Sequence, residues 1–119
     1  MRLKSLFAAC ILGFAALGAA AVSHAEDVRL FVRHRVACYA TWRKSYDGFA
    51  AEQKKAGVFY QAVYRSTDNP NDITVIHDFH SLEEAKAFAA SPSLKAAMEK
   101  SGVIGTPQIW YAVKAATKK

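Results

Sequence analysis

The sequence predicts an α+β fold of the ferredoxin-like class, with element order βαββαβ and helices on one face of a four-stranded antiparallel sheet. Three observations predict it. A run of β-branched and aromatic residues at 73–80 leads directly into helix-start signals. A strand-like alternation stands near the beginning, at 28–36. A polar segment at 67–72 has the composition of a hairpin loop between two strands. Two split βαβ units connected in this way form such a sheet.

Two short helices are expected after the third strand. Ser81 and Glu84 have the three-residue spacing of a capping box, in which each side chain satisfies a backbone amide left open at a helix start. Ser91 followed by Pro92 begins the second helix, because proline at the first helical position gives up no hydrogen bond. Gly102 can adopt the left-handed backbone conformation that ends a helix.

The remaining elements are strands at 28–36, 59–65 and 108–113 and one long helix at 39–56. The long helix carries an apolar stripe that includes Trp42 and Tyr46. We expect the segment 105–107 to turn the chain into the last strand. In the ferredoxin-like topology the first and third strands form the centre of the sheet.

Residues 1–25 have the composition of a secretory signal peptide. Two basic residues precede an uncharged apolar run, and Ser23 and Ala25 place small side chains three and one positions before Glu26. We expect cleavage after Ala25, which leaves a single domain at 26–119, periplasmic or secreted, with no stable membrane anchor. A retained anchor is the alternative, but a run rich in alanine and glycine is weakly apolar for a permanent span.

The mature chain is mildly basic and has one cysteine. Without the leader, sixteen basic residues fall to fourteen against ten acidic ones, so the net charge falls from +6 to +4. These charges form no basic stripe, and nucleic acid is therefore not an expected partner. Cys38 is the single remaining cysteine, so no internal disulfide can form. Stability must come from the core or from a partner subunit.

The face of the sheet opposite the helices also needs a cover. The two central strands carry apolar or aromatic residues on both faces, as in Leu30 beside Phe31 and Val75 beside Ile76. We expect the open face to pack on a second copy of the chain, which would give a homodimer.

Short groups of residues along the mature chain form a pattern shared with a known family. They are His34, Arg35, Val36, Tyr39, Trp42, Tyr64, Arg65, Asn69, Pro70, Asp78, Phe79, His80, Ser81, Glu84, Ala85, Phe88, Ser91, Leu94, Met98, Gly102, Val103, Gly105 and Pro107. On these residues the chain resembles the dimeric α/β-barrel proteins of the antibiotic biosynthesis monooxygenase type and the cyclase-like proteins grouped with them. The resemblance implies the fold and leaves the function open, because that superfamily includes cofactor-free oxygenases of aromatic substrates, haem-degrading proteins, isomerases and members without known activity.

A catalytic hypothesis places a cavity between the open sheet face and the partner subunit. Arg33, Asp78 and His80 are expected to point into it. Asp78 or His80 would take a proton from a phenol-like substrate, and the arginine would stabilise the resulting oxyanion. The alternative is that these residues form ion pairs across the dimer interface. Aromatic ligand-binding walls would come from Tyr60, Tyr64 and Trp110.

Two further histidines are candidates for ligand binding. His34 and His77 are expected on the same face of the two central strands. With His80 they could form a zinc or copper set, but the close ligand spacing of a metal site is missing, so no metal is expected. Histidines satisfied by neighbouring groups are the alternative.

Cys38 stands where the resemblance leads us to expect an acidic residue, directly before the long helix. The helix thereby loses a good N-cap, and a thiol gains a place near the positive end of the helix dipole. It could be a reactive thiol or form an intermolecular disulfide. Burial is the commoner fate of cysteine, and we expect Cys38 to be half-buried under the helix.

These observations together predict an exported homodimer that binds a small aromatic or apolar molecule, with the chemistry of a cofactor-independent monooxygenase. No cofactor is expected. One alternative is a non-catalytic ligand-binding or stress-related module. Another is haem binding or degradation, which requires a histidine aimed into a cavity large enough for a porphyrin.

Overall fold

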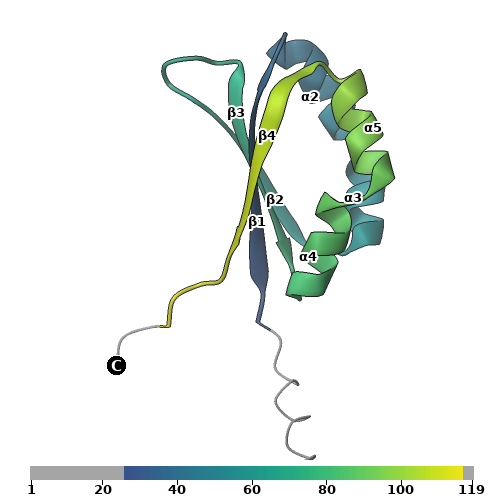
Figure 1. Cartoon of the computed structure of the whole chain (residues 1–119), viewed down its shortest axis with the longest axis vertical. Helices are drawn as coiled ribbons and strands as arrows, with labels where there is room; N and C mark the ends of the chain where they lie inside the picture. Colours follow the sequence, from purple (N-terminus) through teal and green to yellow (C-terminus); the bar gives the residue numbers. More distant parts are fainter. Residues whose placement is uncertain (1–25, 117–119) are drawn as a thin grey trace, which may run out of the picture.

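The computed structural model describes residues 26–116 and has the ferredoxin-like fold (Figure 1). The predicted signal peptide at 1–25 lies outside the described residues. No helix in the described part of the chain is long and apolar enough to cross a membrane. The elements in chain order are β1 (Val28–Val36), α2 (Tyr39–Gly48), α3 (Ala50–Ala56), β2 (Tyr60–Arg65), β3 (Asp72–Phe79), α4 (Leu82–Ala89), α5 (Pro92–Lys100) and β4 (Val103–Ala112).

The sheet has the strand order β2-β3-β1-β4, and every neighbouring pair is antiparallel. The helices all lie on one side of it, and the other side is uncovered (Figure 1). The prediction that the first and third strands are central is confirmed. Their register places Leu30 opposite His77 and Phe31 opposite Ile76. We refer to the uncovered side as the open face.

Alternation along the central strands separates the core from the open face. The even-numbered residues of β1 from Val28 to Val36 are buried under the helices. One core cluster consists of Val28, Leu30, Val32, Phe79, Ala85 and Phe88. The other consists of Val36, Trp42, Ile73 and Val75. The core is therefore divided between the two ends of the sheet.

The two short helices begin where the sequence predicts. The Ser81 side chain accepts a hydrogen bond from the amide of Glu84 at 3.1 Å, and that of Ser91 accepts one from the amide of Leu94 at 3.2 Å. The Glu84 carboxylate reaches back to the amide of His80 at 3.2 Å, one residue before the usual capping-box partner.

The predicted long helix is wrong in one respect, because it is two helices. Residue Phe49, with φ −94° and ψ 5°, ends α2 and begins α3. Gly48 precedes this break, and glycine costs about 1 kcal/mol inside a helix. The break directs Phe49 onto Phe88, with the two ring centres 6.3 Å apart.

The predicted turn at 105–107 is also wrong, because this segment lies inside β4. Ile104 pairs with Arg35 and Gln108 pairs with Arg33, so the register shifts between them. Gly105 has φ +75°, a conformation that favours glycine and is typical of a bulge. The strand continues through the irregularity and is longer than its apolar alternation indicates.

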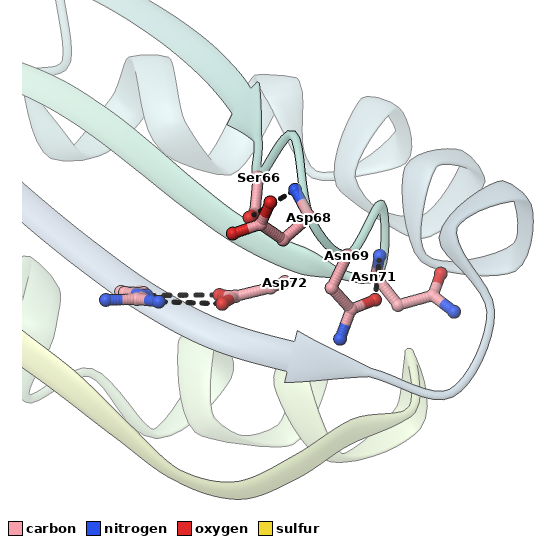
Figure 2. Close-up of polar contacts among 6 residues, drawn as sticks. Ser66, Asp68, Asn69, Asn71 and Asp72 are labelled. Carbon is pink, nitrogen blue, oxygen red and sulfur yellow. Dashed lines mark hydrogen bonds and ion pairs between the residues drawn. The ribbon is translucent and has the colours of Figure 1, made fainter.

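The hairpin loop between β2 and β3 holds the start of α2. Figure 2 shows the internal contacts of the loop, in which Ser66 accepts from the amide of Asp68 at 3.1 Å and Asn69 accepts from that of Asn71 at 2.9 Å. The Asn71 side chain accepts from the amide of Tyr39 at 3.0 Å. Asn71 thus satisfies the amide of Tyr39, the first residue of α2, at a helix start where the N-cap residue Cys38 makes no side-chain cap.

Candidate functional site

The sheet separates the predicted site residues into two groups. Register and exposure place one group on the open face: Arg33, Asp78, Tyr60, Tyr64 and Trp110. His34 and His77 lie on the opposite side, under the helices. His80 follows the last residue of β3 and belongs to neither group. The predicted residues therefore do not form one site.

Two ion pairs within the chain hold the charged residues of the open face. Arg29 donates two hydrogen bonds to Asp78, at 2.7 and 2.8 Å. Arg33 donates two to Asp72, at 3.1 and 2.7 Å, and these are the paired dashed lines in Figure 2. The bonds from Arg33 lower the pKa of the Asp72 carboxyl. Arg33 and Asp78 consequently have separate partners, and the arrangement does not offer an unpaired carboxylate beside an arginine.

His80 is exposed and makes its own surface contacts. Its Nδ1 lies 2.9 Å from a carboxylate oxygen of Asp27, and its ring stacks on Phe59 with the centres 4.2 Å apart. These contacts hold the imidazole away from Arg33, at the far end of the strand.

Aromatic side chains cover part of the open face. The rings of Phe31 and Trp110 stack with centres 5.0 Å apart and an interplanar angle of 2°. The Arg29 guanidinium lies over the Tyr60 ring, with its central carbon 5.7 Å from the centre of that ring. Tyr64 is exposed. These rings form a surface, and a hollow of about 440 Å³ at one end of it is lined by residues that include Arg29, Phe31 and Asp78. A second, smaller and mostly apolar space lies on the other side of the sheet.

A cavity lies between the sheet and the helices, where the two core clusters leave a gap. The cavity has a volume of about 50 Å³. It is lined by Val32, His34, Trp42, Ser45, Tyr46, Phe49, Gln53, Val75, His77, Phe88, Leu94, Ala97, Met98 and Ser101. These side chains are mostly apolar, with a few polar groups among them, which is the composition of small-molecule sites.

Aromatic rings form one wall of the cavity. Trp42 and Tyr46 stack with ring centres 4.8 Å apart, and the edge of the Trp42 ring meets His34 at 5.7 Å. Phe88 meets His77 edge-on at 5.3 Å. The prediction that Trp42 belongs to the core stripe of its helix is confirmed, and the same stripe supplies the wall.

Each of the two buried histidines has a ring nitrogen without a hydrogen-bond partner. His34 is 6% exposed and His77 is 4% exposed, and Nδ1 of each is unpaired. Burial lowers the pKa of both, that of His77 to about 4. His77 pairs with Leu30, four residues from His34 on β1, which separates the histidines by about 14 Å. In the described part of the chain no three metal-binding side chains lie close enough to hold an ion.

Tyr46 connects His77 to the edge strand. Its hydroxyl oxygen lies 2.9 Å from Nε2 of His77 and 2.6 Å from Oε1 of Gln61. Burial raises the pKa of Tyr46 to about 12. The sequence places Tyr46 on an apolar stripe and gives no role to Gln61. A histidine at an inward strand position needs polar partners. From His77, the sequence could therefore have predicted that the hydroxyl of a nearby core residue such as Tyr46 binds its ring.

The expected burial of Cys38 is wrong. The residue is exposed, since it stands at the N-cap of α2 outside the helix-sheet core. The amide and hydroxyl of Thr41 lower the pKa of the thiol, because hydrogen-bond donors favour the thiolate. Its reactivity stays a prediction.

The fold is the ferredoxin-like fold of the antibiotic biosynthesis monooxygenases. A protein from Bordetella bronchiseptica, provisionally designated an antibiotic biosynthesis monooxygenase, is 15% identical, with a TM-score of 0.67 over 76% of this chain and 99% of that one. SnoaB, a cofactor-independent oxygenase from Streptomyces nogalater, is 16% identical, with a TM-score of 0.64 over 78% and 97%.

A third similar structure is the ActVA-Orf6 monooxygenase of Streptomyces coelicolor in complex with Nanaomycin D. It is 18% identical, with a TM-score of 0.55 over 82% of this chain and 94% of that one. No protein-family description and no curated protein matches the sequence. At these identities the similarity establishes the fold, and the function has to be argued from the cavity.

Proposed function

We propose that the protein is an exported homodimer that binds a small aromatic or otherwise apolar molecule in the cavity between sheet and helices. The observation that carries this proposal is an apolar cavity whose lining includes two buried histidines, His34 and His77, each with an unpartnered Nδ1. Unsatisfied buried polar atoms are costly, and a ligand that pairs with them would remove that cost. The ligand named with one similar structure, Nanaomycin D, supports an organic molecule.

A ligand larger than a single ring, such as a naphthol, requires one wall of the cavity to move. The cavity volume is about 50 Å³, which accommodates a few water molecules or a single ring. Helix α5 contributes Leu94, Ala97 and Met98 to the lining but has no fully buried residue. A helix so lightly held is the part of the wall that can shift at least cost. A porphyrin would require a much larger displacement, which makes haem the weaker candidate.

Cofactor-independent oxygenation is the chemistry to test in this cavity, and one observation favours simple binding over it. Burial keeps the pKa of His77 at about 4 and that of Tyr46 at about 12. A general base works best with a pKa near the working pH. Neither group meets this condition, so binding without catalysis is the leading proposal and cofactor-independent oxygenation is the second candidate function.

Binding in the cavity is tested with two neighbouring alanines of α5. Ala97 lines the cavity, whereas Ala96 is exposed. Ala97→Leu is expected to weaken binding of 1-naphthol at least tenfold in calorimetric titration, because the added side chain occupies the space the ligand needs. The matched control Ala96→Leu should bind like the wild type. Equal binding by the Ala97→Leu variant would place the ligand elsewhere.

Export and assembly are tested together by native mass spectrometry. The full-length chain is expressed in a Gram-negative host and collected from the periplasmic fraction. The expected mass is that of two chains beginning at Glu26, because the open face presents stacked Phe31 and Trp110 and exposed Tyr60 and Tyr64. An uncleaved chain in the cytoplasm would contradict export, and a single-chain mass at micromolar concentration would contradict the dimer.

A further inference from the structure

The hydrogen bonds of Tyr46 determine which nitrogen of His77 carries a proton. The phenol has one proton to donate. Oε1 of Gln61, at 2.6 Å, is an acceptor and cannot donate. The Tyr46 O–H therefore points to Gln61, and its oxygen is left to accept from Nε2 of His77 at 2.9 Å. The buried Gln53 also forms a side-chain hydrogen bond that lowers the pKa of Tyr46, so it too donates to this oxygen. Nε2 must then carry hydrogen.

A neutral imidazole has one N–H. Since that hydrogen is on Nε2, Nδ1 of His77 holds an unshared electron pair. This nitrogen is fully buried without a partner, on a residue that lines the cavity. The His77 ring also meets Phe88 edge-on, with the ring centres 5.3 Å apart. No neighbouring protein donor satisfies Nδ1 in the described chain.

We propose that Tyr46 and Gln61 are positioning residues that hold His77 as the Nε2–H tautomer, so that the cavity selects a ligand able to donate a hydrogen bond to Nδ1. Phenols and aromatic N–H compounds have such a donor, whereas quinones, ethers and carboxylates do not. This assignment of ligand class rests on the proposed binding function. The tautomer assignment does not, because it follows from contacts inside the protein.

The chain of bonds also predicts how the tautomer can be reversed. Without an acceptor at position 61, the Tyr46 hydroxyl is free to rotate and donate to Nε2 of His77. The ring proton would then move to Nδ1, and the cavity would present a donor in place of an acceptor. Gln61→Met removes the acceptor with a side chain of similar length, and Gln61→Glu keeps an acceptor oxygen.

The test is long-range ¹H–¹⁵N correlation NMR on ligand-free protein labelled with ¹⁵N-histidine at pH 7. The His77 signals are identified by their loss in His77→Gln. The wild type and Gln61→Glu are expected to show protonated Nε2 and bare Nδ1, and Gln61→Met the reverse. The control Gln108→Met, at an exposed glutamine on the open face, should keep the wild-type pattern. A proton on Nδ1 in the wild type, or no change in Gln61→Met, would overturn the tautomer assignment.

The ligand class is tested with 1-naphthol and 1-fluoronaphthalene, which differ in hydrogen-bond donation at one position. The ratio of their affinities is expected to fall about fivefold in Gln61→Met, the value of one ordinary hydrogen bond. An unchanged ratio would overturn the donor requirement. Failure of both compounds to bind would overturn the ligand assignment and contradict the proposed binding function, while the NMR result would stand on its own.

Discussion

The variant Trp42→Ala is expected to lose about 4 kcal/mol of unfolding free energy, within the range of about 3 to 5 kcal/mol for removing a large buried aromatic side chain. Trp42 is 3% exposed and packs against Val36, Ile73 and Val75. Its removal also takes away the ring that stacks on Tyr46. Urea denaturation at one fixed protein concentration measures the loss, because the proposed dimer would make apparent stability concentration-dependent.

The other tryptophan of the chain is a matched control. Trp110 is 43% exposed and stacks on Phe31 on the open face. Trp110→Ala should leave most of the stability of a single chain intact, and in the proposed dimer it should instead raise the dissociation constant measured by sedimentation. A Trp42→Ala loss below about 2 kcal/mol would contradict the core position of this residue, since large core truncations cost more.

Lowering the pH from 7 to 5 is expected to remove about 2 kcal/mol of unfolding free energy through His77 alone. Burial lowers the pKa of His77 from 6.5 to about 4 in the folded protein, with Asp78 opposing the effect. Below about pH 6.5, His77 therefore binds a proton in the unfolded chain but stays neutral in the folded chain until the pH nears 4. Stability is full above this value and is lost as the pH falls toward 4. Burial of His34 acts in the same direction.

Denaturation curves recorded from pH 7 to pH 4.5 measure this loss. His77→Gln cannot bind the proton and should have a flatter pH profile than the wild type. Gln108→Met changes an exposed residue that does not titrate and should keep the wild-type slope. The same slope in His77→Gln and in the wild type would contradict the assignment.

Residue patterns predict the fold well because its determinants are local. The alternation from Val28 to Val36 identifies the buried face of β1, and Ser81 and Ser91 start their helices through contacts within one turn. The helix break is less visible, because its benefit is a contact between Phe49 and Phe88, which are far apart in the sequence. A residue pattern shows the local weakness of the helix at Gly48, but it does not show the packing of Phe49 on Phe88 that stabilises the break.

The candidate site could be predicted only in part, since it depends on register. Arg29 neutralises Asp78 because antiparallel pairing places the two directly opposite each other. The sequence alone gives the charges and not their partners, so Asp78, His80 and Arg33 could be placed together either in a catalytic hypothesis or in ion pairs across a dimer interface. His34 and His77 share a face as predicted, but the connection from His77 through Tyr46 to Gln61 joins three elements. The spacing of residues along the sequence therefore does not predict this connection.

Asn71 gives the hairpin loop an influence beyond its own turn. Its backbone oxygen accepts from Val36 at 2.9 Å, and its side chain accepts from Tyr39 at 3.0 Å, so one residue fixes both ends of the β1–α2 connection. Trp42 and Tyr46 follow within the next two turns of that helix. The loop between β2 and β3 thus fixes the start of α2, the helix that carries Trp42 and Tyr46. Exposed hairpins usually accept sequence change freely, but variation at this one would be transmitted to the shape of the cavity.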